Sequence, residues 1–152
     1  MDRIESFKIN HNLLEPGFYI SRIDGDIITY DLRTRKPNNG AYMDNATMHS
    51  VEHMFATLIR NSDITDSVVY FGPMGCQTGF YLLVKNLDPK QVFVKVKEVI
   101  QQILDYDGPV FGASAIECGN YANLSLDAAK KEMEVYLKVL EENKEMNFEY
   151  RQ

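Results

Sequence analysis

The segment His49-Ser50-Val51-Glu52-His53 combines residue types and a spacing that suit a metal site. Histidines at positions i and i+4 of a helix lie on one face, so His49 and His53 can present two ring nitrogens to one ion. Glu52 points to the same side, where its carboxylate can take a proton from a metal-bound water or from a substrate carbon acid. The chain has only three histidines, and two of them fall in this segment. This favours a catalytic metal site over two histidines that share a solvated helix face by chance.

A catalytic metal ion usually has three protein ligands, and the spacing leaves the third one open. Cys118 precedes Gly119 at the end of an expected strand, and a His2Cys set suits Zn²⁺ or Fe²⁺ better than Mg²⁺ or Ca²⁺. Downstream glutamates, including Glu117, are competing candidates. The other interpretation of Cys118 is a small buried apolar side chain, which is how most free cysteines are used.

Cys76 is the second thiol, in the glycine-rich segment 72–79. A cysteine in such a turn is not typical of a core position, and a nearby divalent cation or arginine favours its thiolate form. Glu52 and Cys76 could then move protons on opposite sides of a substrate, as an isomerisation through an enediolate requires. The segment lacks the Lys-Ser/Thr pair of a phosphate-binding loop, so an NTPase is not expected.

The apolar pattern predicts the elements that would hold these groups. Strands are predicted at 18–23, 27–32, 67–71, 80–84 and 110–116, and helices at 47–60, from 88 to about 108, and from about 125 onwards. The C-terminal residues 147–152 are expected to fray. The order ββαββαβα, with hairpins between adjacent strands, predicts an α+β two-layer domain whose mainly antiparallel sheet has its helices packed on one side.

Length and composition exclude several classes of protein. With 152 residues, 45% of them hydrophobic, the chain is expected to form a single domain over 1–152 rather than a disordered segment. Its 16 basic and 22 acidic side chains leave a net charge of -6, which argues against a nucleic-acid partner. Neither a membrane-spanning stretch nor a secretory signal is evident, so we expect a cytoplasmic protein with two reduced thiols and no membrane partner.

Five separated segments, ESFKINH, YDLRTRKPN, HSVEH, PMGCQTGF and ECG, resemble the S-ribosylhomocysteine lyase (LuxS) family. The resemblance covers essentially the whole chain in the same order. It implies that His49, His53 and Cys118 bind the metal, natively Fe²⁺ with Zn²⁺ or Co²⁺ as substitutes, and that no organic cofactor is needed. It also implies that Glu52 and Cys76 are the two proton-transfer groups.

The resemblance further implies a reaction. The metal, acting as a Lewis acid, lets the carbonyl migrate along the opened ribose of S-ribosylhomocysteine until β-elimination releases L-homocysteine and 4,5-dihydroxy-2,3-pentanedione, the precursor of autoinducer-2. Such an enzyme serves the methyl cycle, cell-to-cell signalling (quorum sensing) or both.

Four more residues match family positions. Ser6, His11 and Arg33 match positions that contact the substrate or support the catalytic cysteine, and Arg60 matches one that approaches the pocket from across a homodimer with active sites at its interface. Taken alone, the four would be ordinary polar or surface residues. Tyr70 and Glu117 stand where the family commonly has an acidic residue and glutamine.

Two other functions remain open from the residues alone. In a metallopeptidase of the inverted-motif type, Glu52 would activate a metal-bound water and a downstream glutamate would be the third ligand, although such enzymes are generally much longer. In a binding protein, the metal would stabilise a dimer that holds a sugar or amino-acid ligand without turnover. Two proton-transfer groups beside an open metal position favour an enzyme over a binding protein.

Overall fold

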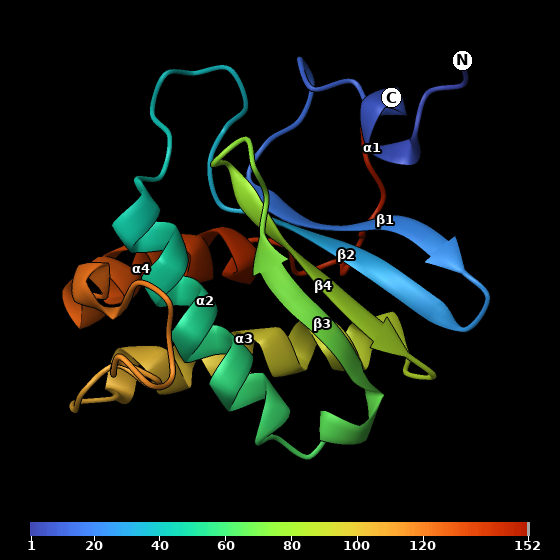
Figure 1. Cartoon of the computed structure of the whole chain (residues 1–152). Coiled ribbons are helices and arrows are strands. Elements are labelled where there is room, and N and C mark those ends of the chain that lie inside the picture. The colour runs from blue at the N-terminus through green and yellow to red at the C-terminus, as the bar shows by residue number, and fades with distance from the viewer. Residues whose placement is uncertain (152) are drawn as a thin grey trace.

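A four-stranded antiparallel sheet is the framework on which the rest of the chain is arranged (Figure 1). The structure is a computed structural model and describes residues 1–151. The strand order is β1-β2-β4-β3. The strands are β1 (Gly17–Asp24), β2 (Ile27–Arg33), β3 (Val68–Pro73) and β4 (Gly79–Lys85). The two predicted hairpins are therefore confirmed, each strand within a few residues of its expected bounds.

The alternation of side chains along β2 gives the sheet two different faces. Tyr30 and Leu32 belong to the hydrophobic core, together with Phe80 and Leu82 of the neighbouring strand β4. Because successive side chains of a strand point to opposite faces, residues 31 and 33 lie on the face away from this core. A polar pair of the candidate site comes from this second face.

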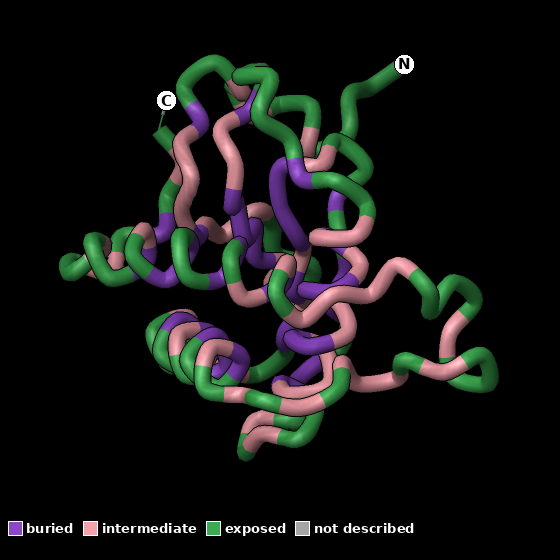
Figure 2. Tube along the Cα trace, turned by 90° about the vertical axis from the view of Figure 1, so that its left-hand side faces the viewer, coloured by how far each residue is buried: buried purple, intermediate pink, exposed green. Residues whose placement is uncertain are grey.

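Three long helices cover the core face of the sheet. They are α2 (Asn45–Arg60), α3 (Pro89–Asp105) and α4 (Leu126–Glu141), and each begins after a side-chain N-cap, from Asp44, Asp88 and Ser125 respectively. Figure 2 shows buried residues recurring along these helices where they meet the sheet. The predicted α+β class, with helices packed on one side of an antiparallel sheet, is confirmed. Among the described residues, no helix is both long and apolar enough to cross a membrane.

Three short helical elements were not predicted from the sequence. They are α1 (Glu5–Lys8), η1 (Thr65–Ser67) and η2 (Tyr121–Asn123). A single turn buries too little apolar surface to leave a periodic pattern in the sequence. η2 nevertheless matters for the site, because it carries Asn123.

The predicted strand at 110–116 is wrong. Within the described residues, the segment between α3 and α4 forms turns and contributes no strand to the sheet. Gly112 has φ +70°, which a strand does not allow, and the backbone N–H groups of Glu117 and Cys118 both donate to the carbonyl of Ser114. Ile116 is almost fully exposed, whereas Val110 and Phe111 pack against the core from this irregular segment.

The expected fraying of the C-terminus is also wrong for residues 147–150; residue 151 is exposed, and residue 152 lies outside the described residues. Phe148 is buried, and its carbonyl accepts a hydrogen bond from the backbone N–H of Ile20 on the edge strand β1 (2.8 Å). Tyr150 donates a hydrogen bond to a buried carboxylate on β2. The tail is thus part of the packed structure.

We expect Phe148→Ala to lower the free energy of unfolding by about 3 kcal/mol, because it removes a buried aromatic side chain. The ring packs against Phe18 and Phe93, with centroids 5.2 and 5.1 Å away. Urea unfolding followed by circular dichroism measures the effect. Glu149→Ala, at the neighbouring exposed position, is the control and should leave the midpoint unchanged. Equal midpoints for both variants would show that the tail is not part of the cooperative core.

Candidate active site

Helix α2 presents both histidines of the HxxEH segment on one side. The buried stripe of the helix, including Val51 and Phe55, is committed to the core. His49 and His53 therefore lie on a half-buried flank, with their ring centroids 4.5 Å apart. The i, i+4 geometry expected from the sequence is present.

Cys118 reaches these histidines from the long connection between α3 and α4, drawn in orange beside α2 in Figure 1. Its Sγ is 3.3 Å from Nε2 of His49. One ligand atom from each of His49, His53 and Cys118 falls within 4.8 Å of the others. The alternative donor, Glu117, is exposed and accepts a hydrogen bond from the hydroxyl of Ser114 (2.6 Å). Of the candidates left open by spacing, the fold brings the thiol to the histidines.

The hydrogen bonds of the two imidazoles orient them for metal binding. Nδ1 of His49 is 2.6 Å from Oδ1 of Asn123, and Nδ1 of His53 is 2.7 Å from the carbonyl of Phe111. Both oxygens are acceptors, so each Nδ1 carries the hydrogen and each Nε2 has a free lone pair. Two imidazole nitrogens and one thiolate form a donor set that fits a divalent ion such as Zn²⁺ or Fe²⁺.

Gly112 allows the loop to come close enough to hold His53. A Cβ at this position would lie 3.1 Å from Nδ1 of His53, and φ +70° disfavours any side chain. Only glycine combines this conformation with this approach. The same residue that excludes a strand therefore supports the candidate metal site.

We expect Gly112→Ala to weaken metal binding about ten- to a hundredfold, because it displaces the carbonyl that orients His53. Competition with a chromophoric chelator measures the affinity. Gly119→Ala, on the other side of Cys118, is the matched control, since a Cβ there meets nothing within 4 Å. Wild-type affinity in Gly112→Ala would mean that the loop carbonyl does not orient the ligand.

Glu52 is half-buried and shares a cleft of about 280 Å³ with His49. The cleft lies between the first half of α2 and the end of β3, and its lining also includes Asn45, Met48, Pro73 and Asn120. A molecule in this cleft would contact the carboxylate and the histidine side of the cluster at once. This placement suits a proton-transfer group beside a metal-bound substrate.

Cys76 lies in the connection from β3 to β4, three residues after Pro73, and its side chain contacts Arg33 of β2 and Thr78 of the same connection. Its Sγ is 3.0 Å from Oγ1 of Thr78 and 3.8 Å from Nη1 of Arg33. Arg33 also donates to Oγ1 of Thr78 (2.7 Å), which leaves the hydroxyl hydrogen free to point at the sulfur. Two donors therefore converge on Cys76, as stabilisation of a thiolate requires.

Gly79 permits the close approach of β4 to β2 that brings Arg33 beside this loop. The two residues are paired across the strands. A Cβ on Gly79 would lie 2.6 Å from the carbonyl oxygen of Leu32, closer than real Cβ contacts allow. The C-terminal end of the loop that carries Cys76 therefore lies in close contact with β2.

Arg33 is buried and paired with Asp31. Nη2 and Nε of Arg33 donate to the two carboxylate oxygens at 2.6 and 3.1 Å, and both side chains are at most 2% exposed. Burial by itself would lower the pKa of Arg33, but the charge and hydrogen bonds of Asp31 outweigh it and raise that pKa. The guanidinium therefore stays charged. Taken alone, the sequence suggested a surface charge at this position.

Three residues of the site were missed in the sequence: Asn123, Asp31 and Thr78. Asn123 lies in a one-turn helix that leaves no pattern. Asp31 and Arg33 are two apart on one strand, and this i, i+2 pair of opposite charges was an available signal. Thr78 follows Cys76 by two residues in the turn, a second local signal.

The remaining predicted residues lie elsewhere in the single chain. Ser6 lines a shallow cleft over the outer sheet face with Thr29 and Tyr81. His11 is half-buried, and its Nδ1 is 2.9 Å from the carbonyl of Ile9. Arg60 is at the C-terminal end of α2, about 16 Å along the helix from His49, and donates to backbone carbonyls at the start of β3. Their substrate-binding role stays a prediction.

Comparison with known proteins distinguishes between the interpretations of this site as part of a lyase, a peptidase or a binding protein. The sequence profile described as S-Ribosylhomocysteinase (LuxS) matches residues 4–147. The chain belongs to the S-ribosylhomocysteine lyase (LuxS) family. It is 43% identical to the S-ribosylhomocysteine lyase of Borrelia garinii subsp. bavariensis over 156 aligned positions that cover 99% of each chain. Its identity to the S-ribosylhomocysteine lyase of Finegoldia magna is 44%, again with 99% of each chain covered.

The range matched by the LuxS family profile includes every residue discussed in this site. A third relative, the S-ribosylhomocysteine lyase of Clostridium beijerinckii, is 44% identical over 136 positions, which are 86% of each chain. The matched range of the family profile ends at residue 147, so the tail that carries Phe148 and Tyr150 lies beyond it.

Proposed function

We propose that this protein is a metal-dependent carbon-sulfur lyase that cleaves S-ribosyl-L-homocysteine to L-homocysteine and 4,5-dihydroxy-2,3-pentanedione, with residues 1–152 as one catalytic domain. The observation that carries the proposal is the His49, His53 and Cys118 cluster in a member of the S-ribosylhomocysteine lyase family, with Glu52 in the adjoining cleft. The relatives named above are all S-ribosylhomocysteine lyases.

The metal ion, when bound by His49, His53 and Cys118, supplies Lewis acidity that makes the protons beside a sugar carbonyl acidic. Glu52 and Cys76 are the groups that remove and return these protons. A carboxylate and a thiolate on separate elements can act on different carbons of the sugar, which carbonyl migration needs. Arg33 and Thr78 hold Cys76 in place by the contacts described above.

The donor set narrows the choice of metal. Two imidazoles and a thiolate suit Fe²⁺, Zn²⁺ and Co²⁺, and we propose Fe²⁺ as the native ion, with Zn²⁺ or Co²⁺ able to replace it, from the family resemblance. No organic cofactor is proposed, since proton transfer and elimination need no hydride or electron carrier. We also propose a cytoplasmic enzyme that supplies the autoinducer-2 precursor for quorum sensing and recycles homocysteine in the methyl cycle and methionine metabolism.

We propose a homodimer in which the uncovered sheet face meets a second copy. The three long helices cover one face, and the apolar side chains of Val69 and Tyr70 are exposed on the edge strand β3. Tyr70 replaces the acidic residue common in the family. A dimer would bury such groups and would let Arg60 approach the pocket of the partner. Ser6 and His11 are proposed to contact the substrate within this assembly, and Arg33, which is buried, is proposed to support the catalytic cysteine.

The test of the function is thiol release from S-ribosylhomocysteine by protein of known metal content, followed with a thiol reagent. Release of homocysteine that depends on bound metal is the expected result. Hydrolysis of peptides without thiol release would favour the peptidase of the inverted-motif type. Absence of thiol release, with Cys76→Ala and Glu52→Gln indistinguishable from wild type in every assay, would favour a binding protein.

A further inference from the structure

The C-terminal tail passes around the edge of the sheet from one face to the other. Phe148 packs on Phe18, whose side chain belongs to the core on the helix side. Two residues later, the ring of Tyr150 stacks on Tyr19, at 4.9 Å between centroids and 21° between planes. Phe18 and Tyr19 are consecutive strand residues and point to opposite faces. The tail is thereby fixed on both sides of β1.

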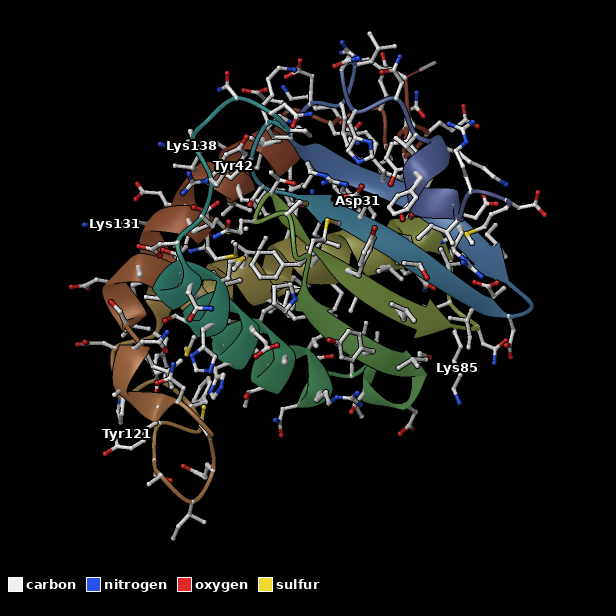
Figure 3. The ribbon with its side chains drawn as sticks, turned by 45° about the horizontal axis from the view of Figure 1, so that its top comes forward. Asp31, Tyr42, Lys85, Tyr121, Lys131 and Lys138 are labelled. Carbon is white, nitrogen blue, oxygen red and sulfur yellow. The ribbon has the colours of Figure 1, made fainter. Side chains whose placement is uncertain are left out.

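This path delivers the hydroxyl of Tyr150 to the buried carboxylate of Asp31. The O–H donates to Oδ2 of Asp31 at 2.6 Å. Burial, followed by the charge of Asp31 and the hydrogen bond to it, raises the pKa of Tyr150, so the hydroxyl keeps its proton at any physiological pH. Figure 3 labels Asp31 on β2. Oδ2 therefore has two donors, Tyr150 and Arg33.

The three nitrogens of Arg33 connect this carboxylate to the catalytic thiol. Nε and Nη2 face Asp31, and Nη1 faces Thr78 and Cys76. The positive charge of Arg33 thus interacts with both the Asp31 carboxylate and the Cys76 sulfur. A hydrogen bond from Tyr150 stabilises the carboxylate of Asp31, so that this carboxylate attracts the guanidinium of Arg33 less strongly. More of the electrostatic potential of Arg33 then acts on the sulfur of Cys76.

We propose that Tyr150 is a positioning residue for Cys76, which acts through Asp31 and Arg33 to stabilise the thiolate of the proton-transfer group. The proposal rests on the proposed function for the role of Cys76. The tail lies beyond the range matched by the family profile. By this proposal it helps to set the reactivity of the Cys76 thiol. The hydroxyl does not touch the substrate, and its effect is carried by the buried ion pair.

Four tyrosines from different parts of the fold feel the charge of Asp31. Asp31 is near Tyr19 of β1, Tyr81 of β4, Tyr136 of α4 and Tyr150 of the tail. The hydroxyls of Tyr19 and Tyr136 donate instead to the backbone carbonyls of Glu15 and Gly17. Among the described residues, Tyr150 is the tyrosine whose hydroxyl is bonded to the carboxylate.

The experiment measures the rate of Cys76 alkylation by iodoacetamide as a function of pH, in the full-length, metal-loaded protein without substrate. Cys76 is exposed, and peptide mass spectrometry separates its alkylation from any reaction at Cys118. We expect Tyr150→Phe to raise the pH midpoint of Cys76 alkylation by about half a unit, which slows the reaction below the midpoint about threefold. Tyr19→Phe, in the stacked ring next to it, should leave the midpoint unchanged.

A second variant is expected to shift the pH midpoint of Cys76 alkylation in the opposite direction. Asp31→Asn removes the competing negative charge, so the field of Arg33 falls more fully on Cys76 and the midpoint should move down. A loosened fold would shift both variants in the same direction, and that result would overturn the proposal. If Asp31→Asn does not fold, as judged by circular dichroism, the comparison of Tyr150→Phe with Tyr19→Phe decides alone, and equal midpoints would overturn it.

Thiol release provides an independent readout. We expect Tyr150→Phe to lower kcat for S-ribosylhomocysteine cleavage about threefold with KM nearly unchanged, because Cys76 acts in proton transfer and Tyr150 makes no substrate contact. If wild-type protein releases no thiol, the proposed function fails. The alkylation midpoints still report on the link between Tyr150 and Cys76.

Discussion

Replacing Glu52 by glutamine is expected to lower thiol release from S-ribosylhomocysteine by about three orders of magnitude while the metal content stays at the wild-type level. Glutamine has the size of glutamate and lines the same cleft, but its amide cannot accept a proton from a sugar carbon. The carboxylate of Glu52 is placed beside His49 in this cleft. Steady-state kinetics with matched metal analysis measures the effect.

Glu117→Gln is the control for this prediction. Its carboxylate is exposed and accepts a hydrogen bond from Ser114, and glutamine keeps the size of the side chain without its charge. We expect wild-type turnover and metal content. Substantial thiol release by Glu52→Gln would remove Glu52 from the reaction. Loss of metal in Glu117→Gln would instead point to a glutamate ligand, as the peptidase reading requires.

Cys118→Ala is expected to lose stoichiometric metal, with an affinity at least about a hundredfold below that of wild type. Removing a ligand should cost more than disturbing its orienting partner, for which losses of ten- to a hundredfold are typical. Two imidazoles alone leave a catalytic ion short of its usual three protein ligands. Metal analysis after dialysis, and chelator competition for the residual affinity, measure the loss.

The other cysteine is the matched control for Cys118→Ala. Cys76 belongs to the Arg33 and Thr78 cluster, so Cys76→Ala should keep one metal ion per chain while turnover is lost. The pattern separates the two thiols by function. A Cys118→Ala protein that keeps stoichiometric metal would contradict the assignment of the third ligand and support the inverted-motif peptidase.

Local spacing was sufficient for several features of this protein. The i, i+4 relation of His49 and His53 lies within a single helix, and helix geometry alone brings the rings together. Strands and capped helices were recognised because alternating and 3.6-residue patterns are short-range properties of the chain. The family followed from five separated motifs, and the resemblance predicted roles for Cys76 and Cys118.

The sequence alone therefore determined the class of fold, the pairing of the two histidines and the family, because each of these depends on neighbouring residues or on whole motifs. Only the tertiary structure decided which donor meets the histidines, which oxygens orient their rings, and that Asp31, Arg33 and Tyr150 form a buried network behind Cys76. Residues 110–116 show the reason: their apolar character suggested a strand, but Gly112 and His53 set the conformation of the loop. Contacts between residues distant in sequence depend on how the elements pack, and local patterns do not encode that packing.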